Sequence, residues 1–517
     1  MFREIIPLIN REVSEGKTDE RDVGRSFWDF CTVLGGRVIG LPLAFLAAVL
    51  ATRVLGNEGY GTLSLFFLVS QLFFLFGINW TSAAVIRYGK EEFIESDKIN
   101  RTFWARNTLL IPSLFISLLL IWVGREKVLS YLNVEPEGIW LLGLFLIGLT
   151  LSDYVQSVLQ ATANLRFYSG IKVLQFLFIF IFLCLVYFFP SDRGKIFMVI
   201  WAYVGSALLV SILPLLRIQY SLFFPAVLDY HKVKRIFIFS YPVIFGSVSA
   251  YVVNWIDLIV IKRYSPIADV GIYSLAYQGM TALQQISMVI SVVSTPMMVS
   301  FLVIGRKDLI LRYVERIVPQ GLLAWNILVC VVTLSAFYLI PKIFGIDFAA
   351  SATPFALLMA GMSWNILNTF YSSVMTAYEL IKQSMGIGIV IALLNLVGDL
   401  VLVPGLGICG ASLATSFSFM VGAILSQWLI CSRLDRRGWK ELIFPLPSLL
   451  VIFLFLVISQ LLSRLAILIA LVFFSWILAK MLGLFQKEDM ALLEKIEMPE
   501  WIRIWMSRLY VLLGSQQ

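Results

Sequence analysis

Residues 51–65 read ATRVLGNEGYGTLSL, and residues 261–275, which lie 210 positions further along the chain, read IKRYSPIADVGIYSL. Each stretch joins the first and second long apolar run of a set of six. Because six is an even number, two such sets share one orientation, as parallel repeats of a transporter do. The sequence therefore predicts two copies of a six-helix lobe. The identical positions at this offset are Arg53 with Arg263, Gly61 with Gly271, Ser64 with Ser274, and Leu65 with Leu275.

Apolar runs of membrane-spanning length recur along the whole chain. Hydrophobic residues make up 60% of the chain and charged residues 14%, whereas a soluble domain has about 45–50% and about 25%. Since a spanning helix needs about 20 apolar residues, we expect an all-α polytopic membrane protein of about fourteen transmembrane helices, two six-helix lobes plus two C-terminal helices. The runs lie near 26–52, 60–86, 103–123, 138–160, 170–190, 196–217, 236–260, 272–303, 318–341, 354–377, 383–403, 408–430, 443–461 and 465–485.

The distribution of Lys and Arg predicts the orientation. With the N-terminus inside, the inner segments carry roughly three times as many basic residues as the outer loops, which is typical of cytoplasmic segments. We therefore expect a cell-membrane protein with both termini in the cytoplasm, and the net charge of +8 needs no nucleic-acid partner. The expected segments are a cytoplasmic N-terminal segment (1–25), the N-terminal lobe (26–217), a cytoplasmic linker (218–235), the C-terminal lobe (236–430), an extra two-helix hairpin (431–485) and a cytoplasmic amphipathic tail (486–517).

The sequence carries no pattern of a metal site or a catalytic centre. The five cysteines lie in or beside apolar runs without C-x-x-C spacing, so a disulfide, a metal site and redox chemistry lack support. No Walker loop indicates ATP binding. The one histidine, His231, lies in a basic link. We expect no enzyme, no catalytic or metal-binding residue and no cofactor.

Polar side chains on the apolar runs mark a candidate substrate path. Ionisable residues inside spanning helices are costly and usually face protein or water. Asp153, Gln156, Gln160 and Asn164 follow one another at steps of three and four, which predicts one shared helical face. Such stripes either join helices through hydrogen bonds or line a hydrated cavity, and for the long Asn and Gln side chains we expect the cavity. The other residues of this path are Asn254, Asp257, Gln284, Asn365 and Asn368.

Three ionisable residues invite more specific predictions. Arg37 lies in GGRVIGLP, beside glycines and Pro42, and its guanidinium could bind a phosphate group through paired N–H donors; a structural ion pair with an aspartate, or snorkelling toward the inner face, is the alternative. Asp257 and Asp399 could bind a coupling proton or cation. For Asp399, which follows Asn395 by four residues, a structural role is an equal alternative.

Two longer stretches resemble a known family. AFLAAVLATRVLGNEGYGTLSL followed by INWTSAAVIRYG is similar to the opening of the polysaccharide flippases, which belong to the multidrug/oligosaccharidyl-lipid/polysaccharide exporter superfamily. LLNLVGDLVLVPGLGICGASLATSFS resembles that family's eleventh and twelfth helices. The resemblance implies two six-helix lobes around a cationic cavity and the flipping of a polyprenyl-diphosphate-linked oligosaccharide to the outer leaflet, with Arg37 as the diphosphate contact.

The resemblance also implies partners and rivals. The implied partners are the lipid-linked oligosaccharide, membrane lipid, and a polysaccharide polymerase or glycosyltransferases. One rival hypothesis is a cation-coupled multidrug exporter of the same superfamily, which usually has twelve helices. The other is a membrane enzyme of polysaccharide assembly, which usually needs catalytic groups in an external loop, whereas the outer loops expected here are short.

Overall fold

The described part of the chain is built from helices alone. The computed structural model describes residues 20–484 except 163, 190–193, 216–218, 437 and 482, and it leaves out the helical side chains of 20–34, 36–38, 165, 215, 245, 292 and 293. The predicted amphipathic tail at 486–517 and most of the N-terminal segment lie outside the described residues. Within them, no strand interrupts the series of helices, so the predicted all-α fold is confirmed.

Fourteen apolar segments among the described residues are long enough to cross a membrane. In this part of the chain twelve helices meet the criteria of length and apolar composition. Two of these, α2 and α14, each contain two segments joined at a glycine outside the helical region, Gly56 with φ 65° and Gly407 with φ 56°. A positive φ costs glycine little because it has no Cβ. The predicted count of about fourteen is thereby confirmed.

The chain divides into two compact units, which we describe separately. Unit 1 comprises residues up to Leu55 together with Leu65–Ser247, and unit 2 comprises Gly56–Ser64 together with Val248 onward. Helices α2 and α9 therefore contribute to both units. The lobe boundaries expected from the sequence stay predictions.

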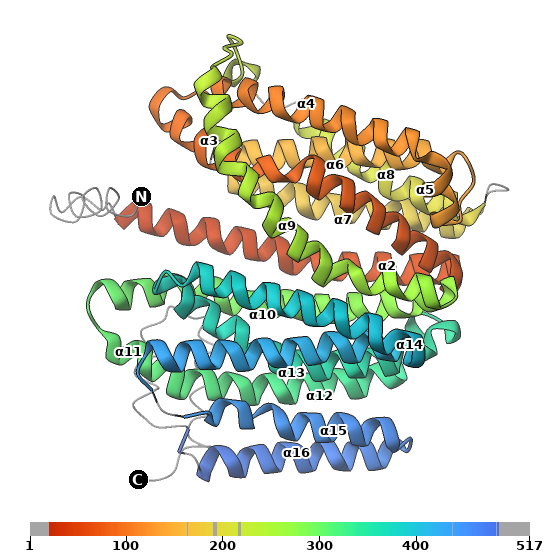
Figure 1. Cartoon of the computed structure of the whole chain (residues 1–517), viewed down its shortest axis with the longest axis vertical. Helices are drawn as coiled ribbons and strands as arrows, with labels where there is room; N and C mark the ends of the chain where they lie inside the picture. Colours follow the sequence, from red (N-terminus) through yellow and green to blue (C-terminus); the bar gives the residue numbers. More distant parts are fainter. Residues whose placement is uncertain are drawn as a thin grey trace. The chain divides into compact units, whose positions relative to one another are not determined.

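Unit 1 holds the first helices of the chain (Figure 1). Its α6, α7 and α8 are held together by the buried side chains of Val155, Leu159, Ile171 and Val210. Because lipid is as apolar as these side chains, close packing rather than water exclusion holds such helices together. The elements are α2 (Glu20–Gly77, shared with unit 2), η1 (Asn79–Thr81), α3 (Ser82–Ser96), α4 (Asn100–Val123), α5 (Arg125–Leu132), α6 (Gly138–Ala161), α7 (Leu165–Phe188), α8 (Lys195–Leu215) and η2 (Tyr220–Leu222).

Unit 2 is centred on α13, which packs against α10, α12, α14 and α15 (Figure 1). A Cβ on Gly361 of α13 would lie 2.7 Å from Cα of Ser416, so only glycine allows α14 to approach this closely. The elements are α9 (Tyr230–Tyr264, shared with unit 1), α10 (Ile267–Val303), α11 (Lys307–Arg312), η3 (Tyr313–Ile317), α12 (Val318–Ile343), η4 (Ile346–Ser351), α13 (Ala352–Ala377), α14 (Ile381–Arg433), η5 (Lys440–Ile443), α15 (Pro445–Val457) and α16 (Leu461–Met481).

One predicted helix is shorter than its apolar run. The run at 60–86 forms a helix only as far as Gly77, after which η1 and α3 follow. The carbonyl oxygen of Gly77 accepts a hydrogen bond of 2.5 Å from the hydroxyl group of Ser113 in α4. This side-chain partner satisfies a carbonyl that a continuing helix would otherwise bond. Because of this break, η1 and the start of α3 can bond to side chains of α4 and α6.

Candidate functional site

Two aspartates from distant parts of the sequence meet inside unit 2. Asp257 lies on α9 and Asp399 on α14, and their carboxyl groups are close enough to interact electrostatically. Asp257 is only 2% exposed and Asp399 is fully buried. Both were predicted as possible coupling-ion residues, and the structure brings them together at one site.

Three further side chains complete what we call the Asp257–Asp399 cluster: Tyr273 of α10, and Asn395 and Thr415 of α14. The hydroxyl group of Tyr273 donates a short hydrogen bond to Oδ2 of Asp257, and the Thr415 hydroxyl donates to the same oxygen at 3.0 Å. Nδ2 of Asn395 donates in turn to Oγ1 of Thr415 at 3.1 Å. All five side chains belong to unit 2.

The cluster contains more acceptors than donors. Oδ1 of Asp257, Oδ1 of Asn395 and both carboxylate oxygens of Asp399 are buried and have no hydrogen-bond donor among the described residues. Two carboxylates this close cannot both stay ionised without a compensating positive charge. A shared proton or a bound cation supplies that charge, and oxygen atoms are the ligands that hard cations prefer. The geometry therefore suits the capture of a proton or a small cation.

A second buried cluster, in unit 1, is electrically complete. Arg106 of α4 is fully buried, and its Nη2 lies 2.6 Å from Oδ2 of Asp153 on α6. Arg106 also donates to the hydroxyl groups of Thr81 at 3.0 Å and Ser82 at 3.1 Å. The carboxylate of Asp153 accepts further hydrogen bonds from Ser82 at 2.7 Å and Asn79 at 3.4 Å. We call these residues the Arg106–Asp153 cluster.

The predicted polar stripe of unit 1 is only partly present on α6. The Nε2 atom of Gln156 donates to Ser152, one turn earlier on the same helix, at 2.8 Å, and Gln160 is half-buried. The predicted fourth member, Asn164, is wrongly placed: α6 ends at Ala161, and Asn164 instead caps α7 by accepting a hydrogen bond from the N–H of Phe167. Asparagine favours this position because its side chain satisfies a free N–H at a helix start.

In unit 2 the predicted path residues lie on three helices. Asn368 of α13 donates to Asn365 at 3.2 Å and accepts a hydrogen bond of 2.6 Å from Ser426 of α14. Asn254 of α9 is exposed and Gln284 of α10 is half-buried. Asn368 thus takes part in bonding between helices, whereas the hydrogen bonds of Asn365 stay within α13. The substrate-path role of the whole set stays a prediction.

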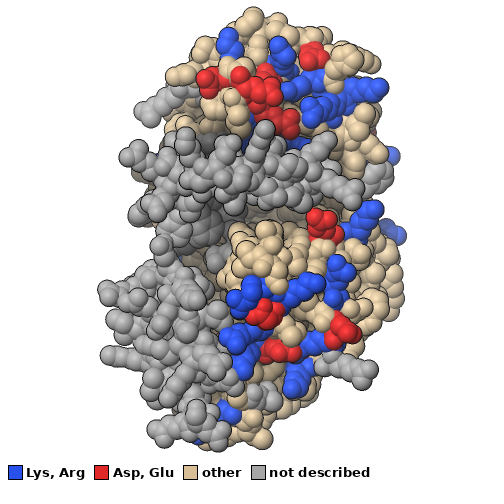
Figure 2. Space-filling model, turned by 90° about the vertical axis from the view of Figure 1, so that its left-hand side faces the viewer, with Lys and Arg blue, Asp and Glu red and all other residues tan. Residues whose placement is uncertain are grey.

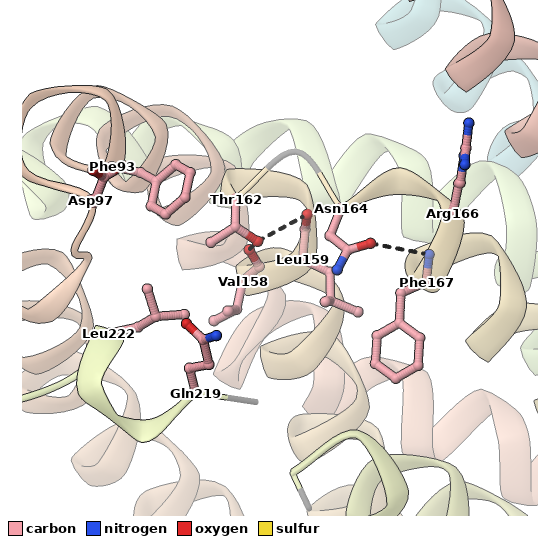
Figure 3. Close-up of a pocket in the computed structure, with 10 residues that line it drawn as sticks. All are labelled: Phe93, Asp97, Val158, Leu159, Thr162, Asn164, Arg166, Phe167, Gln219 and Leu222. Atoms are coloured by element: carbon pink, nitrogen blue, oxygen red, sulfur yellow. Dashed lines mark hydrogen bonds between the residues drawn. The ribbon is translucent and has the colours of Figure 1, made fainter. Parts of the chain in front are cut away.

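A pocket of about 860 Å³ in unit 1 lies where α3 and α6 end and α7 begins (Figure 3). Its polar lining is Asp97, Thr162, Asn164, Arg166 and Gln219, and five apolar side chains complete it. Figure 3 shows Arg166 pointing away from the other lining residues, beyond the α7 cap. Of the predicted stripe Asp153, Gln156, Gln160 and Asn164, only Asn164 lines this pocket.

Basic side chains lie on the surface of the protein near several helix ends. Figure 2 shows Lys and Arg side chains interspersed with fewer Asp and Glu side chains. In unit 2, Arg306 precedes α11 and Lys307 begins it, while Arg436 and Lys440 follow α14. Basic residues at helix ends are typical of cytoplasmic segments.

Comparison with known proteins identifies the family. The family model described as polysaccharide biosynthesis protein matches residues 29–302, which is more than half of the chain. The chain belongs to this family. No curated protein sequence matches the chain.

Solved structures show which fold this member of the polysaccharide biosynthesis family adopts. It is similar to the lipid II flippase MurJ in an inward closed conformation, with a TM-score of 0.64 and 15% identity over 87% of this chain and 98% of that one. It is also similar to a multidrug resistance transporter of the MATE family in an inward-facing conformation, with a TM-score of 0.55 and 15% identity over 78% of this chain and 98% of that one. The resemblance to the polysaccharide family is confirmed by the family match, and the solved structures show the shared fold.

The family match includes Arg37, whose position in α2 is described but whose side chain is not. Its contact with a diphosphate therefore stays a prediction. Inspection of the sequence did not single out Arg106, Tyr273 or Thr415. Arg106 is the only one that a simple signal could have found, because an arginine near the start of an apolar run needs an acidic partner if it is buried.

Proposed function

We propose that this protein flips a polyprenyl-diphosphate-linked oligosaccharide from the cytoplasmic to the outer leaflet of the cell membrane, for the assembly of a surface polysaccharide. The observation that carries the proposal is membership of the polysaccharide biosynthesis family in a chain whose fold is shared with a lipid II flippase. The protein moves its substrate by alternating access and is not an enzyme. A polysaccharide polymerase or glycosyltransferases act on what it delivers.

The physical demands of the substrate agree with the chain's polar residues. The sugar head needs amide and hydroxyl partners, which the residues of the predicted path offer on α6, α9, α10 and α13. The diphosphate needs a cation, and Arg37 is the candidate because a guanidinium binds phosphate oxygens in pairs. The lipid tail stays in the bilayer, so the protein has to enclose only the polar head.

Coupling to a cation is the second part of the proposal. The Asp257–Asp399 cluster presents donor-free oxygen atoms from two carboxylates and one amide in a buried position. A cation or proton entering this cluster neutralises the repulsion between the carboxylates. Its binding and release favour different conformations of the protein, because a ligand shifts an equilibrium only through different affinities for the two states. An ion gradient can then drive the translocation in one direction.

The decisive experiment deletes the gene and determines the leaflet in which lipid-linked saccharide accumulates. We expect accumulation in the cytoplasmic leaflet, where a membrane-impermeant sugar-oxidising reagent cannot reach it in intact cells. Wild-type protein restores the outer-leaflet pool, and Arg37→Ala restores it poorly. Arg306→Ala, which changes an exposed arginine paired with Asp308 at 2.8 Å, is the matched control and complements fully. An unchanged distribution in the deletion strain would refute the proposal.

The similarity to a multidrug transporter supports a second candidate, a cation-coupled exporter of small drugs. Measuring the efflux of cationic dyes from the same deletion strain separates the two functions. We expect dye efflux to be unaffected and the saccharide distribution to change. Mass spectrometry of the lipid-linked saccharide, incubated with the purified protein in vesicles, tests the enzyme hypothesis: a changed mass would indicate bond chemistry, and we expect none.

A further inference from the structure

The pocket of about 860 Å³ in unit 1, which we call the α6–α7 pocket, lies within one compact unit. All ten residues that line it fall between Leu65 and Ser247. The described lining contains no member of the Arg106–Asp153 cluster. Sites for small organic ligands usually have volumes of about 300–1,000 Å³. The α6–α7 pocket is therefore a candidate binding site separate from the buried clusters.

Packing fixes the apolar lining of the α6–α7 pocket. One part of this lining packs around Ile99 at the start of α4, and the other part packs around Ile171 of α7. In Figure 3 the ring of Phe93 lies on one side of the α6 end and the ring of Phe167 on the other. A lining that is already ordered loses little conformational freedom when a ligand binds, which favours binding. The members of the first group are Phe93, Val158 and Leu222, and those of the second are Leu159 and Phe167.

Hydrogen bonds hold the link that carries Gln219 against α4. The carbonyl oxygen of Gln219 accepts from the N–H of Leu222 at 3.0 Å, and the carbonyl oxygen of Leu222 accepts from the N–H of Ile99 at 3.0 Å. The carbonyl oxygen of Phe223 accepts from the indole N–H of Trp104, also at 3.0 Å. These bonds fix the wall of the pocket that Gln219 and Leu222 form.

Polar side chains of the pocket keep unused hydrogen-bonding groups. The side-chain amide of Gln219, the Nδ2 atom of Asn164 and the carboxylate of Asp97 have no hydrogen-bond partner among the described residues. The Thr162 hydroxyl donates to the carbonyl oxygen of Val158 at 3.0 Å and can still accept a bond. The pocket thus offers both donors and acceptors, which come from the ends of α3 and α6, the cap of α7 and the link before η2.

The charges of the lining suit an uncharged ligand. Of the described lining residues only Arg166 is basic, and it points away from the others (Figure 3). A phosphate group in the pocket would meet the carboxylate of Asp97 without a facing cation, and like charges repel. Sugar hydroxyl groups both donate and accept hydrogen bonds, as amide and carboxylate groups require. The apolar face of a sugar ring can pack against Phe93 or Phe167.

The α6–α7 pocket lies where a membrane-spanning unit meets water. The helices α3 and α6 end there, and α7 begins there. The link beside the pocket carries the exposed aromatic side chains of Tyr220 and Phe224, and tyrosine is enriched at the level of the lipid headgroups. Gln219 and Leu222 belong to the linker predicted to be cytoplasmic, 218–235. A sugar attached to a lipid of the inner leaflet lies at this level.

From these observations we infer that the α6–α7 pocket binds the sugar head of the lipid-linked saccharide on the cytoplasmic side, before the head enters the translocation path. This inference rests on the proposed flippase function. The polar side chains of the pocket bond the sugar hydroxyl groups, and its two aromatic rings pack against sugar faces. The head leaves the pocket before it is translocated. Weaker docking therefore raises the substrate concentration for half-maximal transport and leaves the maximum rate unchanged.

The first test measures binding at the pocket itself. In a protein whose natural cysteines are replaced and whose folding is verified, Gln219→Cys is labelled with a maleimide in detergent. The probe is the saccharide that mild acid releases from the lipid-linked saccharides of the cells that make this protein. At about four times its dissociation constant we expect the probe to slow labelling about fivefold, because it then occupies about four fifths of the pockets. Gln383→Cys, at an exposed glutamine of α14, is the control and labels at an unchanged rate.

A variant that removes one charge sharpens this test. Asp97 has φ 52°, a conformation that asparagine also tolerates, so Asp97→Asn changes the side chain and keeps the backbone. We expect the half-protecting concentration of the saccharide to rise about tenfold, because a hydrogen bond to a charged group is the stronger kind. Asp308→Asn leaves it unchanged. Absence of protection at every saccharide concentration would overturn the inference, as would protection by a nucleoside diphosphate sugar alone.

The second test measures transport by the reconstituted protein. Gln219→Trp fills the pocket from its exposed rim, and Gln383→Trp makes the same change outside the pocket. We expect Gln219→Trp to raise the half-saturating concentration of lipid-linked saccharide about tenfold at an unchanged maximum rate, and Gln383→Trp to change neither. A wild-type half-saturating concentration for Gln219→Trp would overturn the inference.

The two proposals fail in distinguishable ways. If the released saccharide protects Gln219→Cys but the wild type moves no lipid-linked saccharide, the pocket binds sugar and the flippase function is wrong. If the wild type moves the saccharide, while the probe gives no protection and Gln219→Trp transports like the wild type, the flippase function stands and the docking site is wrong.

Discussion

Two buried clusters of this protein contain aspartates, but only one of them also contains a positively charged side chain. In unit 1, Asp153 is neutralised by Arg106 at 2.6 Å and accepts hydrogen bonds from Ser82 and Asn79. In unit 2, Asp257 and Asp399 lie beside each other, and both oxygens of Asp399 lack a donor among the described residues. The ion pair of Arg106 and Asp153 joins the two helices that carry it. The carboxyl groups of Asp257 and Asp399 have no such partner, so they need a proton or a cation from outside the cluster.

The comparison shows how to separate structural from functional acids in a membrane protein. Burial alone does not distinguish them, since Asp153, Asp257 and Asp399 all lie inside helical bundles. What differs is whether the neighbouring side chains already satisfy the carboxylate. On this criterion Asp153 moves from the predicted substrate path toward a structural role, and Asp257 and Asp399 gain support as the coupling site.

Breaking the complete pair should have the largest effect on stability. Arg106→Met leaves the carboxylate of Asp153 buried without its cation, and removing one partner of a buried pair costs about 3–5 kcal/mol. We expect a large fall in the thermal unfolding temperature of the purified protein in detergent. The double variant Arg106→Met with Asp153→Leu should recover most of the loss, because neither charge then remains. A single variant as stable as the wild type would show that the pair is not structural.

Cations should raise the stability of the protein through Asp257 and Asp399. A ligand that binds only the folded state at 100 times its dissociation constant stabilises it by about 2.7 kcal/mol. Thermal unfolding in a series of sodium, potassium, lithium and choline chlorides should therefore reveal one cation that raises the unfolding temperature. Asp399→Asn should abolish this response, whereas Asp308→Asn, which changes an exposed carboxylate beside Arg306, should keep it. If the wild type, Asp399→Asn and Asp308→Asn all respond equally, the cation does not bind at the Asp257–Asp399 cluster.

Removing a neutral member of the same cluster should have a smaller effect. Thr415→Val deletes a hydroxyl group that donates to Asp257 and accepts from Asn395. A hydrogen bond of this kind contributes about 1 kcal/mol, so the cation concentration for half-maximal stabilisation should rise about fivefold. Thr333→Val is the control, because the Thr333 hydroxyl donates to Val329 within its own helix at 2.7 Å. An unchanged midpoint for Thr415→Val would place the cation elsewhere.

Interhelical hydrogen bonds outside both clusters should matter least. Ser426→Ala removes the bond of 2.6 Å to Asn368, and such bonds inside membranes average about 0.6 kcal/mol. We expect a small decrease in unfolding temperature and unchanged cation dependence. A loss of transport without a loss of stability would instead place Asn368 on the substrate path.

The helices and the repeat could be predicted from the sequence, whereas the contacts between distant helices could not. The length of each apolar run predicts a spanning helix, and the offset that matches Gly61 with Gly271 predicts two copies of one lobe. Periodicity places Asn395 and Asp399 on one face, but it does not reveal that this face meets Asp257 of α9. Arg106 stood at the edge of an apolar run, where a solvated position and a buried ion pair look alike. The prediction that Asn164 shares a helical face with Gln160 was wrong, because a spacing of four residues does not show where a helix ends.

The most direct test reconstitutes the protein in sealed vesicles and measures translocation of a lipid-linked saccharide with and without a gradient of the cation that stabilises it. We expect the gradient to accelerate translocation by the wild type at least about tenfold, which corresponds to about 1.4 kcal/mol, and to leave Asp399→Asn unaffected. Equal acceleration of both proteins would contradict a coupling role for the buried aspartate pair. The absence of translocation by the wild type under every gradient would contradict the flippase itself.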